Sequence, residues 1–429
     1  MRRTLAPLAA LTLAACGGGT ESSSHTSTST STAPTGPTYH QDIAPLLAEH
    51  CTRCHQEGSI APFALTTYDQ VKTMAGAIAK ATADRTMPPV NVDQSGACGT
   101  YKDANWLSDA QIATIKAWAE GGTIEGEKAA PITPPAPDHL GSDAITMTMA
   151  EAYMPQASGD HATDDYRCFF LDPKVAVDQY ATGFEIIPGE RTEVHHMLLY
   201  SLQSDNEEQK AQARDDADPL PGWSCFGGVD GNLLAAWAPG KDTVRYPTDT
   251  GIKISGGRRL VMQIHYNLLG GTAPDQTTIK LATVPDVKKE AALAPLSDEK
   301  LSLLPDSADA TAGGQYVLAL LGVPEIEMHG VAPHMHLLGR TEHLSVRDTG
   351  TDPADATCLM NVTNWNFHWQ QLYFYEKSVI LKSNQTVAFD CHYDTRGQTK
   401  TITYGEGTQD EMCIVYTYLT LPQGGKLPL

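Results

Sequence analysis

The spacing of apolar and polar residues divides the chain into a helical part and a β-rich part. Two capping boxes, Thr67 with Gln70 and Ser108 with Gln111, each predict the start of a helix. After the second box, apolar residues recur at helical spacing until two glycines end the pattern. A third, shorter helix is expected over residues 42–50. We therefore predict a small all-α domain in the N-terminal third of the chain.

From about residue 143 onward, the pattern changes to that of an all-β protein. Short runs rich in β-branched and aromatic residues alternate with clusters of Gly, Pro, Asp and Asn, and the one strong helix signal covers 207–214. The remaining chain is too long for one sandwich, so two are predicted, joined at the Ala-, Pro- and Asp-rich stretch 284–314. The clearest strand-like runs are 257–267, 315–321 and 414–421.

Charge and the N-terminal residues narrow the class of protein. A formal net charge of −21 argues against nucleic acid as a partner, since a phosphate-binding face is basic. Residues 1–16 combine a charged start, a short apolar core and the ending Leu-Ala-Ala-Cys16, which is typical of a secretory signal. This ending resembles the bacterial lipobox, which implies that Cys16 is lipidated; the alternative is an ordinary signal with an incidental cysteine. Gly17 favours the outer membrane by the same resemblance, and 17–38 is expected to be a flexible polar tether.

The run Cys51-Thr-Arg-Cys54-His55 has the spacing of a c-type haem attachment site. The two thiols reach the two vinyl groups of one haem, and the adjoining imidazole becomes the proximal iron ligand. A zinc site would need a second pair of ligands, and none follows closely. Met87, held in an extended loop by two prolines, is the expected sixth ligand, with Met74 as the alternative. Three helices around a haem resemble the class I cytochrome c fold, and His/Met ligation suits electron transfer.

Export also determines what the remaining cysteines are expected to do, because disulfides persist outside the cytoplasm. Of nine cysteines, one is assigned to lipid and two to haem, so an even number remains. These fit three bridges, although sequence alone leaves their connectivity open. They are Cys98, Cys168, Cys225, Cys358, Cys391 and Cys413.

The first of two histidine groups in the β-rich part is His195, His196 and His265. His195 and His196 are adjacent, and neighbours on a regular strand point to opposite faces. Both can therefore bind one metal only at a strand end or a bulge. His265 lies in a strand-like run and would complete a site of three imidazoles.

The second group is His334 and His336, whose i, i+2 spacing is expected to put both rings on one face of a strand, with Met412 much later in the chain. Two imidazoles and a thioether favour copper, especially Cu(I). Taken singly, each group is as often structural as metal-binding. Three other histidines near these groups are expected to have structural or supporting roles: His329, His368 and His392.

The order of these motifs resembles that of the copper type II, ascorbate-dependent monooxygenases, over roughly residues 160–425. The motifs are His-His-Met-Leu-Leu-Tyr200, Gln-Ile-His-Tyr266, His-Met-His-Leu-Leu-Gly-Arg340 and Asp-Glu-Met-Cys-x-x-Tyr416. The resemblance implies two jelly-roll-like β-sandwiches, each holding one copper ion. It implies one copper that stores and passes an electron, held by His195, His196 and His265. It implies a second copper that binds dioxygen and abstracts substrate hydrogen, held by His334, His336 and Met412, with Tyr416 in the active site.

The same resemblance implies two disulfides. Cys391 with Cys413 resembles a family bridge beside the methionine ligand, and Cys168 with Cys225 resembles one that flanks the adjacent histidines. The pairing of the last two cysteines, Cys98 and Cys358, stays open.

One departure from the family concerns the substrate. Peptidylglycine hydroxylases carry an arginine two residues before the His-x-His pair and an asparagine two residues after the methionine ligand. Ala332 and Ile414 stand at these positions. A substrate without the carboxylate that the arginine would bind is therefore expected.

We thus expect a copper-dependent monooxygenase that uses dioxygen to hydroxylate a C–H bond of a small organic substrate. A reductant or redox protein would supply electrons through the covalently bound haem c, and the lipid alone would hold the chain on the membrane. The alternative is a non-catalytic haem- and copper-containing electron carrier or copper-binding surface lipoprotein. The expected parts are the signal (1–16), the tether (17–38), an all-α cytochrome c domain (39–126), a linker (127–142), the three-histidine sandwich (143–290) and the His-His-Met sandwich (291–429).

Overall fold

The computed structural model describes residues 36–57, 61–90, 92–102, 104–134, 136, 138–157, 163–225, 228–238, 243–268, 271–367, 369–405 and 409–428. The signal, Cys16, most of the tether and His368 lie outside these residues. Across the described ranges, no helix combines the length and apolar character needed to cross a membrane.

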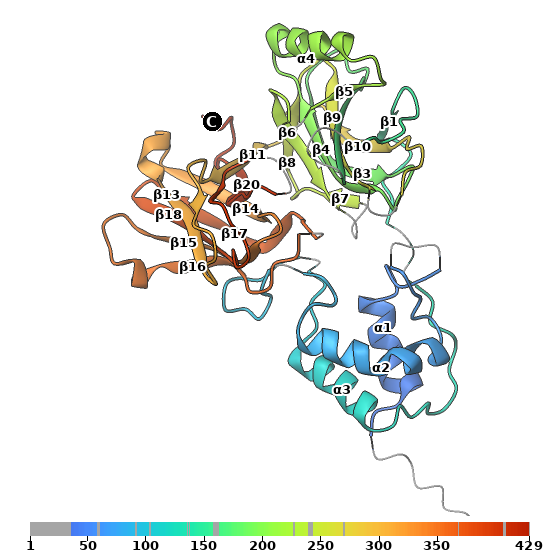
Figure 1. Cartoon of the computed structure of the whole chain (residues 1–429). Coiled ribbons are helices and arrows are strands. Elements are labelled where there is room, and N and C mark those ends of the chain that lie inside the picture. The colour runs from blue at the N-terminus through green and yellow to red at the C-terminus, as the bar shows by residue number, and fades with distance from the viewer. Residues whose placement is uncertain are drawn as a thin grey trace, which may run out of the picture. The chain divides into compact units, whose positions relative to one another are not determined.

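The helical part has the elements that the sequence pattern predicts (Figure 1). Both capping boxes are present, at the starts of α2 and α3. Leu47, Val71 and Trp118 are buried in one core, and Met74 packs against it. The elements are η1 (Tyr39–Ile43), α1 (Ala44–His50), α2 (Tyr68–Ala83) and α3 (Asp109–Glu120).

The β-rich part forms four sheets among the described residues, with α4 (Asp205–Ala217) where the one helix signal lies. A five-stranded sheet runs in the order β5 (Trp223–Ser224), β2 (Asp164–Leu171), β9 (Leu260–Asn267), β4 (Val194–Ser201) and β6 (Asn232–Trp237). A four-stranded sheet runs β13 (Ala310–Val317), β18 (Gln385–Tyr393), β15 (Gly339–Asp348) and β16 (Thr357–Val362). A small pair joins β12 (Ser302–Leu303) to β19 (Ile402–Thr403).

The nine-stranded sheet belongs to both sandwiches. Its order is β1 (Ile145–Thr148), β10 (Thr278–Val284), β3 (Gln179–Ile187), β8 (Thr250–Ile254), β11 (Lys289–Ser297), β20 (Ile414–Thr420), β14 (Glu325–His334) and β17 (Tyr373–Lys382), with β7 (Thr243–Arg245) paired to β3. One core combines side chains of this sheet and the five-stranded sheet, such as Ile279 and Ile264. A second core combines side chains of this sheet and the four-stranded sheet, such as Val415 and Phe389. The two sandwiches therefore share one sheet.

The stretch 284–314 joins the sandwiches as a strand rather than as a loop. β11 pairs in parallel with β8 and antiparallel with β20, so it continues the large sheet from one sandwich into the other. Its Ala- and Pro-containing sequence is not typical of a central strand, so the sequence pattern did not indicate it. The expected strand 315–321 is also shifted, because β13 ends at Val317 and a short 3-10 helix, η3 (Leu318–Leu321), follows. A second 3-10 turn, η4, covers Pro353–Asp355.

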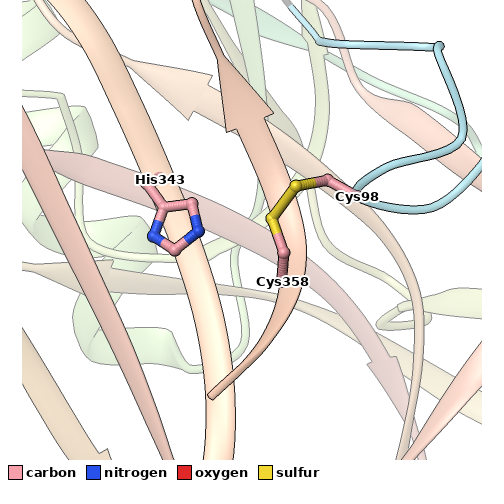
Figure 2. A group of neighbouring side chains, drawn as sticks. All are labelled: Cys98, His343 and Cys358. Atoms are coloured by element: carbon pink, nitrogen blue, oxygen red, sulfur yellow. A yellow bond between two sulfur atoms is a disulfide. The ribbon is translucent and has the colours of Figure 1, made fainter. Parts of the chain in front are cut away.

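The three expected disulfides are present. Cys168–Cys225 and Cys391–Cys413 confirm the pairings that the family resemblance implies. The third bridge, Cys98–Cys358, joins residues 260 positions apart and connects the chain between α2 and α3 to β16 (Figure 2).

Candidate metal centres

A β-bulge brings the adjacent histidines to one side of the five-stranded sheet. β4 pairs with β9, but the register shifts between Val194, opposite Tyr266, and His196, opposite His265. The extra residue, His195, is the bulged position, and a bulge reorients its side chain. The sequence-based requirement of a bulge or a strand end is therefore confirmed.

The three imidazoles converge through their Nδ1 atoms. His196 Nδ1 lies 3.4 Å from His195 Nδ1 and 3.3 Å from His265 Nδ1, and one ligand atom of each ring lies within 4.8 Å of the others. Two nitrogens bound at about 2.0–2.1 Å to one ion lie roughly 3.3–3.4 Å apart at a tetrahedral angle. The spacing of these atoms therefore fits a metal ion between them.

Asp164 and Tyr166 hold the ring of His265. Its Nε2 donates to Asp164 Oδ1 at 2.7 Å, which places the lone pair on Nδ1, toward the other two rings. The ring of Tyr166 stacks on the ring of His265, with their centroids 4.2 Å apart and their planes 3° from parallel. A carboxylate behind a ligating histidine fixes its tautomer and orientation and increases its basicity.

Burial favours the neutral form of two of these imidazoles, those of His196 and His265. Burial lowers the pKa of His196 well below its ordinary value, and the neighbouring histidines lower it further. Burial also lowers the pKa of His265, and Asp164 opposes this shift only in part. Because a metal ion needs the unprotonated ring, both shifts favour metal binding.

The second cluster forms at the end of a strand, not along its face. β14 ends at His334, so His336 lies beyond it, and the expectation that both rings share a strand face is wrong. The rings nevertheless lie 5.3 Å apart, nearly perpendicular. The buried carboxylate of Glu411 holds the turn, accepting from His336 N at 2.8 Å and Leu338 N at 2.6 Å.

In this second cluster, a hydrogen bond holds the Nδ1 atom of each histidine ring. His334 Nδ1 donates to Gln370 Oε1 at 2.5 Å, and His336 Nδ1 donates to the Asp410 carbonyl at 3.0 Å. Both lone pairs therefore sit on Nε2. Burial, together with the neighbouring His336 ring, lowers the pKa of His334 to about 3 and keeps it neutral.

Met412 is placed by β20 and by a disulfide. His334, the last residue of β14, pairs with Ile414, the first residue of β20, and Met412 lies two residues before Ile414 in the sequence. The thioether is buried, the adjacent Cys413 is bonded to Cys391, and Tyr393 Oη donates to the Met412 carbonyl at 2.8 Å. These residues supply two Nε2 atoms and a sulfur, a donor set that suits copper.

Tyr416 and Phe367 flank the clusters. The ring of Tyr416 lies 6.2 Å from that of His334. Phe367 contacts both groups, because its ring stacks on His195 at 5.2 Å and meets His336 edge-on at 6.0 Å.

Sequence reasoning missed the residues that support the ligands. The aromatic- and glutamine-rich run that contains Phe367 and Gln370 was a usable signal, because it interrupts the β pattern between two strands. Asp164 and Glu411 had no comparable signal, since their partners lie far away in the sequence.

Three further histidines contact residues outside the two clusters. His329 Nε2 lies 2.9 Å from Thr420 Oγ1, and His392 Nδ1 lies 2.6 Å from Asp309 Oδ1. His343 lies beside the Cys98–Cys358 bridge (Figure 2), with a ring nitrogen within 4.8 Å of both sulfurs. Because the two sulfurs are bonded to each other, they offer no thiolate to a metal ion.

The residue types of the Cys51–His55 motif suit haem attachment, which stays a prediction. Cys51 and Cys54 follow α1 in consecutive turns and lie outside the three disulfides. His55 Nδ1 donates to the Phe63 carbonyl at 3.1 Å, which places the lone pair on Nε2. Burial lowers the pKa of His55, so the ring is available in its neutral form. Met87 is 43% exposed in the loop after α2, and its ligation of the iron stays a prediction.

The two sandwiches share one sheet, and each carries a group of histidines whose ring nitrogens could hold a metal ion. Two family models match the chain: the copper type II ascorbate-dependent monooxygenase N-terminal domain over residues 150–271 and its C-terminal domain over 315–422. Together they cover more than half of the sequence. The chain belongs to this family.

Several curated proteins are similar to the chain. Tyramine beta-hydroxylase of Caenorhabditis briggsae is 25% identical over 341 residues, which cover 74% of this chain and 54% of that protein. Human dopamine beta-hydroxylase is 23% identical, over 66% of this chain and 47% of that protein. Peptidyl-glycine alpha-amidating monooxygenase A of Xenopus laevis is 23% identical, over 59% and 26%. The chain thus spans about half the length of the first of these relatives.

Among solved structures, the infectious bursal disease virus VP2 subviral particle matches at 10% identity, over 66% of this chain and 72% of that one. The TM-score of this match is 0.19, which does not indicate a shared fold.

Proposed function

We propose that the chain is a two-copper monooxygenase that hydroxylates a C–H bond of a small organic substrate. Substrate, dioxygen, two electrons and two protons give the alcohol and water. The observation that carries the proposal is the pair of donor sets, one of three Nδ1 atoms and one of two Nε2 atoms with the Met412 thioether. An electron carrier has no need of the second set, because it would bind no dioxygen.

The two centres take different roles in this proposal. His195, His196 and His265 would hold a copper ion that supplies electron storage, and His334, His336 and Met412 would hold one that supplies the dioxygen chemistry. The chain's own residues favour the neutral form of the imidazoles and orient their nitrogen lone pairs toward the metal positions. Burial lowers the pKa of His196 and His334, while Asp164 and Gln370 orient the rings of His265 and His334. The ring of Tyr416 stands beside His334, where a substrate would approach.

The substrate is proposed to lack the carboxylate that an arginine at position 332 would bind. Ala332 lies two residues before His334 on β14, opposite Tyr416, and Ile414 lies opposite His334 on β20. Neither side chain offers a charge or a hydrogen bond. A substrate bound there would therefore be held by shape and apolar contact.

The haem motif is proposed to bind haem c and to supply the electrons, with Met87 as the sixth iron ligand. The His55 geometry supports this reading. The N-terminal residues support export and attachment to the membrane through lipidated Cys16. The electron donor would be a small reductant or a redox protein.

The test is to count copper by elemental analysis and haem by pyridine haemochrome, and then to measure oxygen uptake with candidate substrates. Two coppers and one haem per chain, with substrate-dependent uptake, are expected. Met412→Ile should lose uptake and one copper. Met360→Ile replaces a fully buried methionine of the same sandwich and should keep both. A wild-type chain that holds one copper or none would contradict the proposal.

A further inference from the structure

Residues 92–102, here called the docking segment, leave the helical part between α2 and α3 and enter the core of the C-terminal sandwich. Val92 bridges to Val362 at the end of β16, and Tyr101 bridges to Tyr375 on β17. Val92 and Tyr101 are 0% and 1% exposed, and both belong to the core built around the four-stranded sheet. The segment is therefore an integral part of that sandwich.

Hydrogen bonds and a disulfide hold the docking segment along its length. Asp93 N donates to the Asn361 carbonyl at 2.8 Å, and Lys102 N donates to the Phe374 carbonyl at 2.7 Å. Between these two points, Cys98 is bonded to Cys358 on β16 (Figure 2). The disulfide lies between two backbone hydrogen bonds, so the docking segment cannot readily detach from the sandwich.

This docking constrains where the expected haem ligand lies. Met87 precedes Val92 by five residues, and an extended chain of that length spans at most about 18 Å. The Met87 loop must therefore stay close to the end of β16, whatever the orientation of the helices. The helical part is in this way tied to the His-His-Met sandwich.

The residues that follow β16 continue the connection. In residues 363–367, here called the junction loop, Asn364 Nδ2 donates to the Arg85 carbonyl at 3.4 Å, two residues before Met87. Trp365 Nε1 donates to the His336 carbonyl at 2.9 Å. Phe367 stacks on the ring of His195. One loop thus contacts the Met87 loop at one end and both histidine clusters at the other.

We propose that the junction loop is the route by which an electron passes from the haem to the copper centres, with Phe367 positioned to deliver it to the His195 side. The inference rests on the proposed function, since it needs haem and copper bound. The step is a one-electron transfer in which ferrous haem is oxidised and a cupric ion is reduced, and no bond forms or breaks. The docking segment keeps the two ends of this route together.

The test follows the haem spectrum, not turnover. In the holoprotein without oxygen or substrate, the haem is reduced by a light flash, and its reoxidation is followed at the α-band with the copper oxidised. We expect a first-order decay whose rate does not change with protein concentration. Phe367→Leu and Asn364→Ala should slow it, because each removes one contact of the route. Tyr316→Leu, which removes an exposed ring elsewhere in the sandwich, should leave it unchanged.

A second variant tests the docking segment. Cys98→Ser with Cys358→Ser removes the covalent bond and leaves the docking segment held only by its buried side chains and hydrogen bonds, so the decay should slow. Thermal melting and copper content establish that this variant is folded. Mapping of disulfide-linked peptides provides a separate readout, and free Cys98 and Cys358 thiols in the wild-type protein would overturn the docking.

The outcomes separate the inference from the function on which it rests. If copper-loaded wild type reoxidises its haem but Phe367→Leu and Asn364→Ala keep the wild-type rate, the route is wrong and the haem supply stands. A wild-type rate that rises with protein concentration also overturns the route, because electrons then pass between molecules. If copper does not accelerate reoxidation at all, haem supply and route both fail.

Discussion

Replacing Asp164 by asparagine changes one atom of a buried side chain behind the three-histidine centre. The Asp164 carboxylate can only accept a hydrogen bond, so it forces the His265 proton onto Nε2 and the lone pair onto Nδ1. An asparagine amide can also donate, and would then stabilise the opposite tautomer, whose Nδ1 carries a proton. Asp164→Asn should therefore keep the fold and weaken metal binding.

The size of the effect follows from the contact. The 2.7 Å hydrogen bond joins an imidazole to a carboxylate, and hydrogen bonds to charged groups contribute about 1.5–3 kcal/mol. Loss of the group behind a ligating histidine typically weakens metal affinity by about 10- to 100-fold. The two ranges agree, because tenfold in affinity corresponds to about 1.4 kcal/mol.

The assay is a competition titration of the copper-free protein against a chromophoric chelator, which resolves the two sites by affinity. The matched control is Asp165→Asn. Asp165 is the next residue and is equally buried, but the hydrogen bonds to its carboxylate come from Tyr153 Oη at 2.7 Å and Gln156 N at 2.9 Å, not from a histidine. The control should keep wild-type affinity at both sites.

Two results would contradict this role of Asp164. If Asp164→Asn binds both coppers as tightly as wild type, the carboxylate does not orient His265. If Asp165→Asn loses as much affinity as Asp164→Asn, the effect reflects disruption of the start of β2 rather than the loss of one hydrogen bond.

Three further predictions concern other parts of the chain. Gln370→Leu removes the support of His334 Nδ1 and should weaken the second copper site by about tenfold in the same titration; unchanged affinity would contradict this role. Asp218→Asn leaves the buried Arg167 guanidinium without its carboxylate and should lower the free energy of unfolding by about 3 kcal/mol in urea. Burial raises the pKa of Asp218, but Arg167 and two backbone N–H groups lower it more, to a net value below its ordinary one. Its stabilisation is therefore complete above the ordinary pKa and is lost as the pH falls through the folded pKa, and this loss should be absent in Asp218→Asn. Ser108→Ala removes the N-cap of α3 and should lower the free energy of unfolding by about 1 kcal/mol, which would be measured as a lower melting temperature of the helical part.

Features set by neighbouring residues were predictable from the sequence. The capping boxes located the starts of α2 and α3, because each depends on side chains three residues apart. A bulge or a strand end at His195 was also predictable, since two adjacent side chains on a regular strand cannot face one metal ion, and the structure has the bulge. The residue types of the two metal centres followed from the same local patterns and from their order.

The His334–His336 pair shows where local reasoning fails. The two residues were identified, but the reason was wrong, because the strand ends at His334. The turn beyond it is held by Glu411, which lies 75 residues from His336 in the sequence. Strand periodicity carries no information about such a partner.

Only the tertiary structure decided how the parts are connected. β11 continues one sheet through both sandwiches, and the Cys98–Cys358 bridge spans 260 residues. Asp164, Gln370 and Phe367 reach the histidines from separate strands and loops. Local patterns depend on interactions within a few residues, so the sequence alone determined them. A disulfide partner or a support behind a metal ligand depends instead on which distant segments pack within a few ångströms of one another, and only the folded chain determines that.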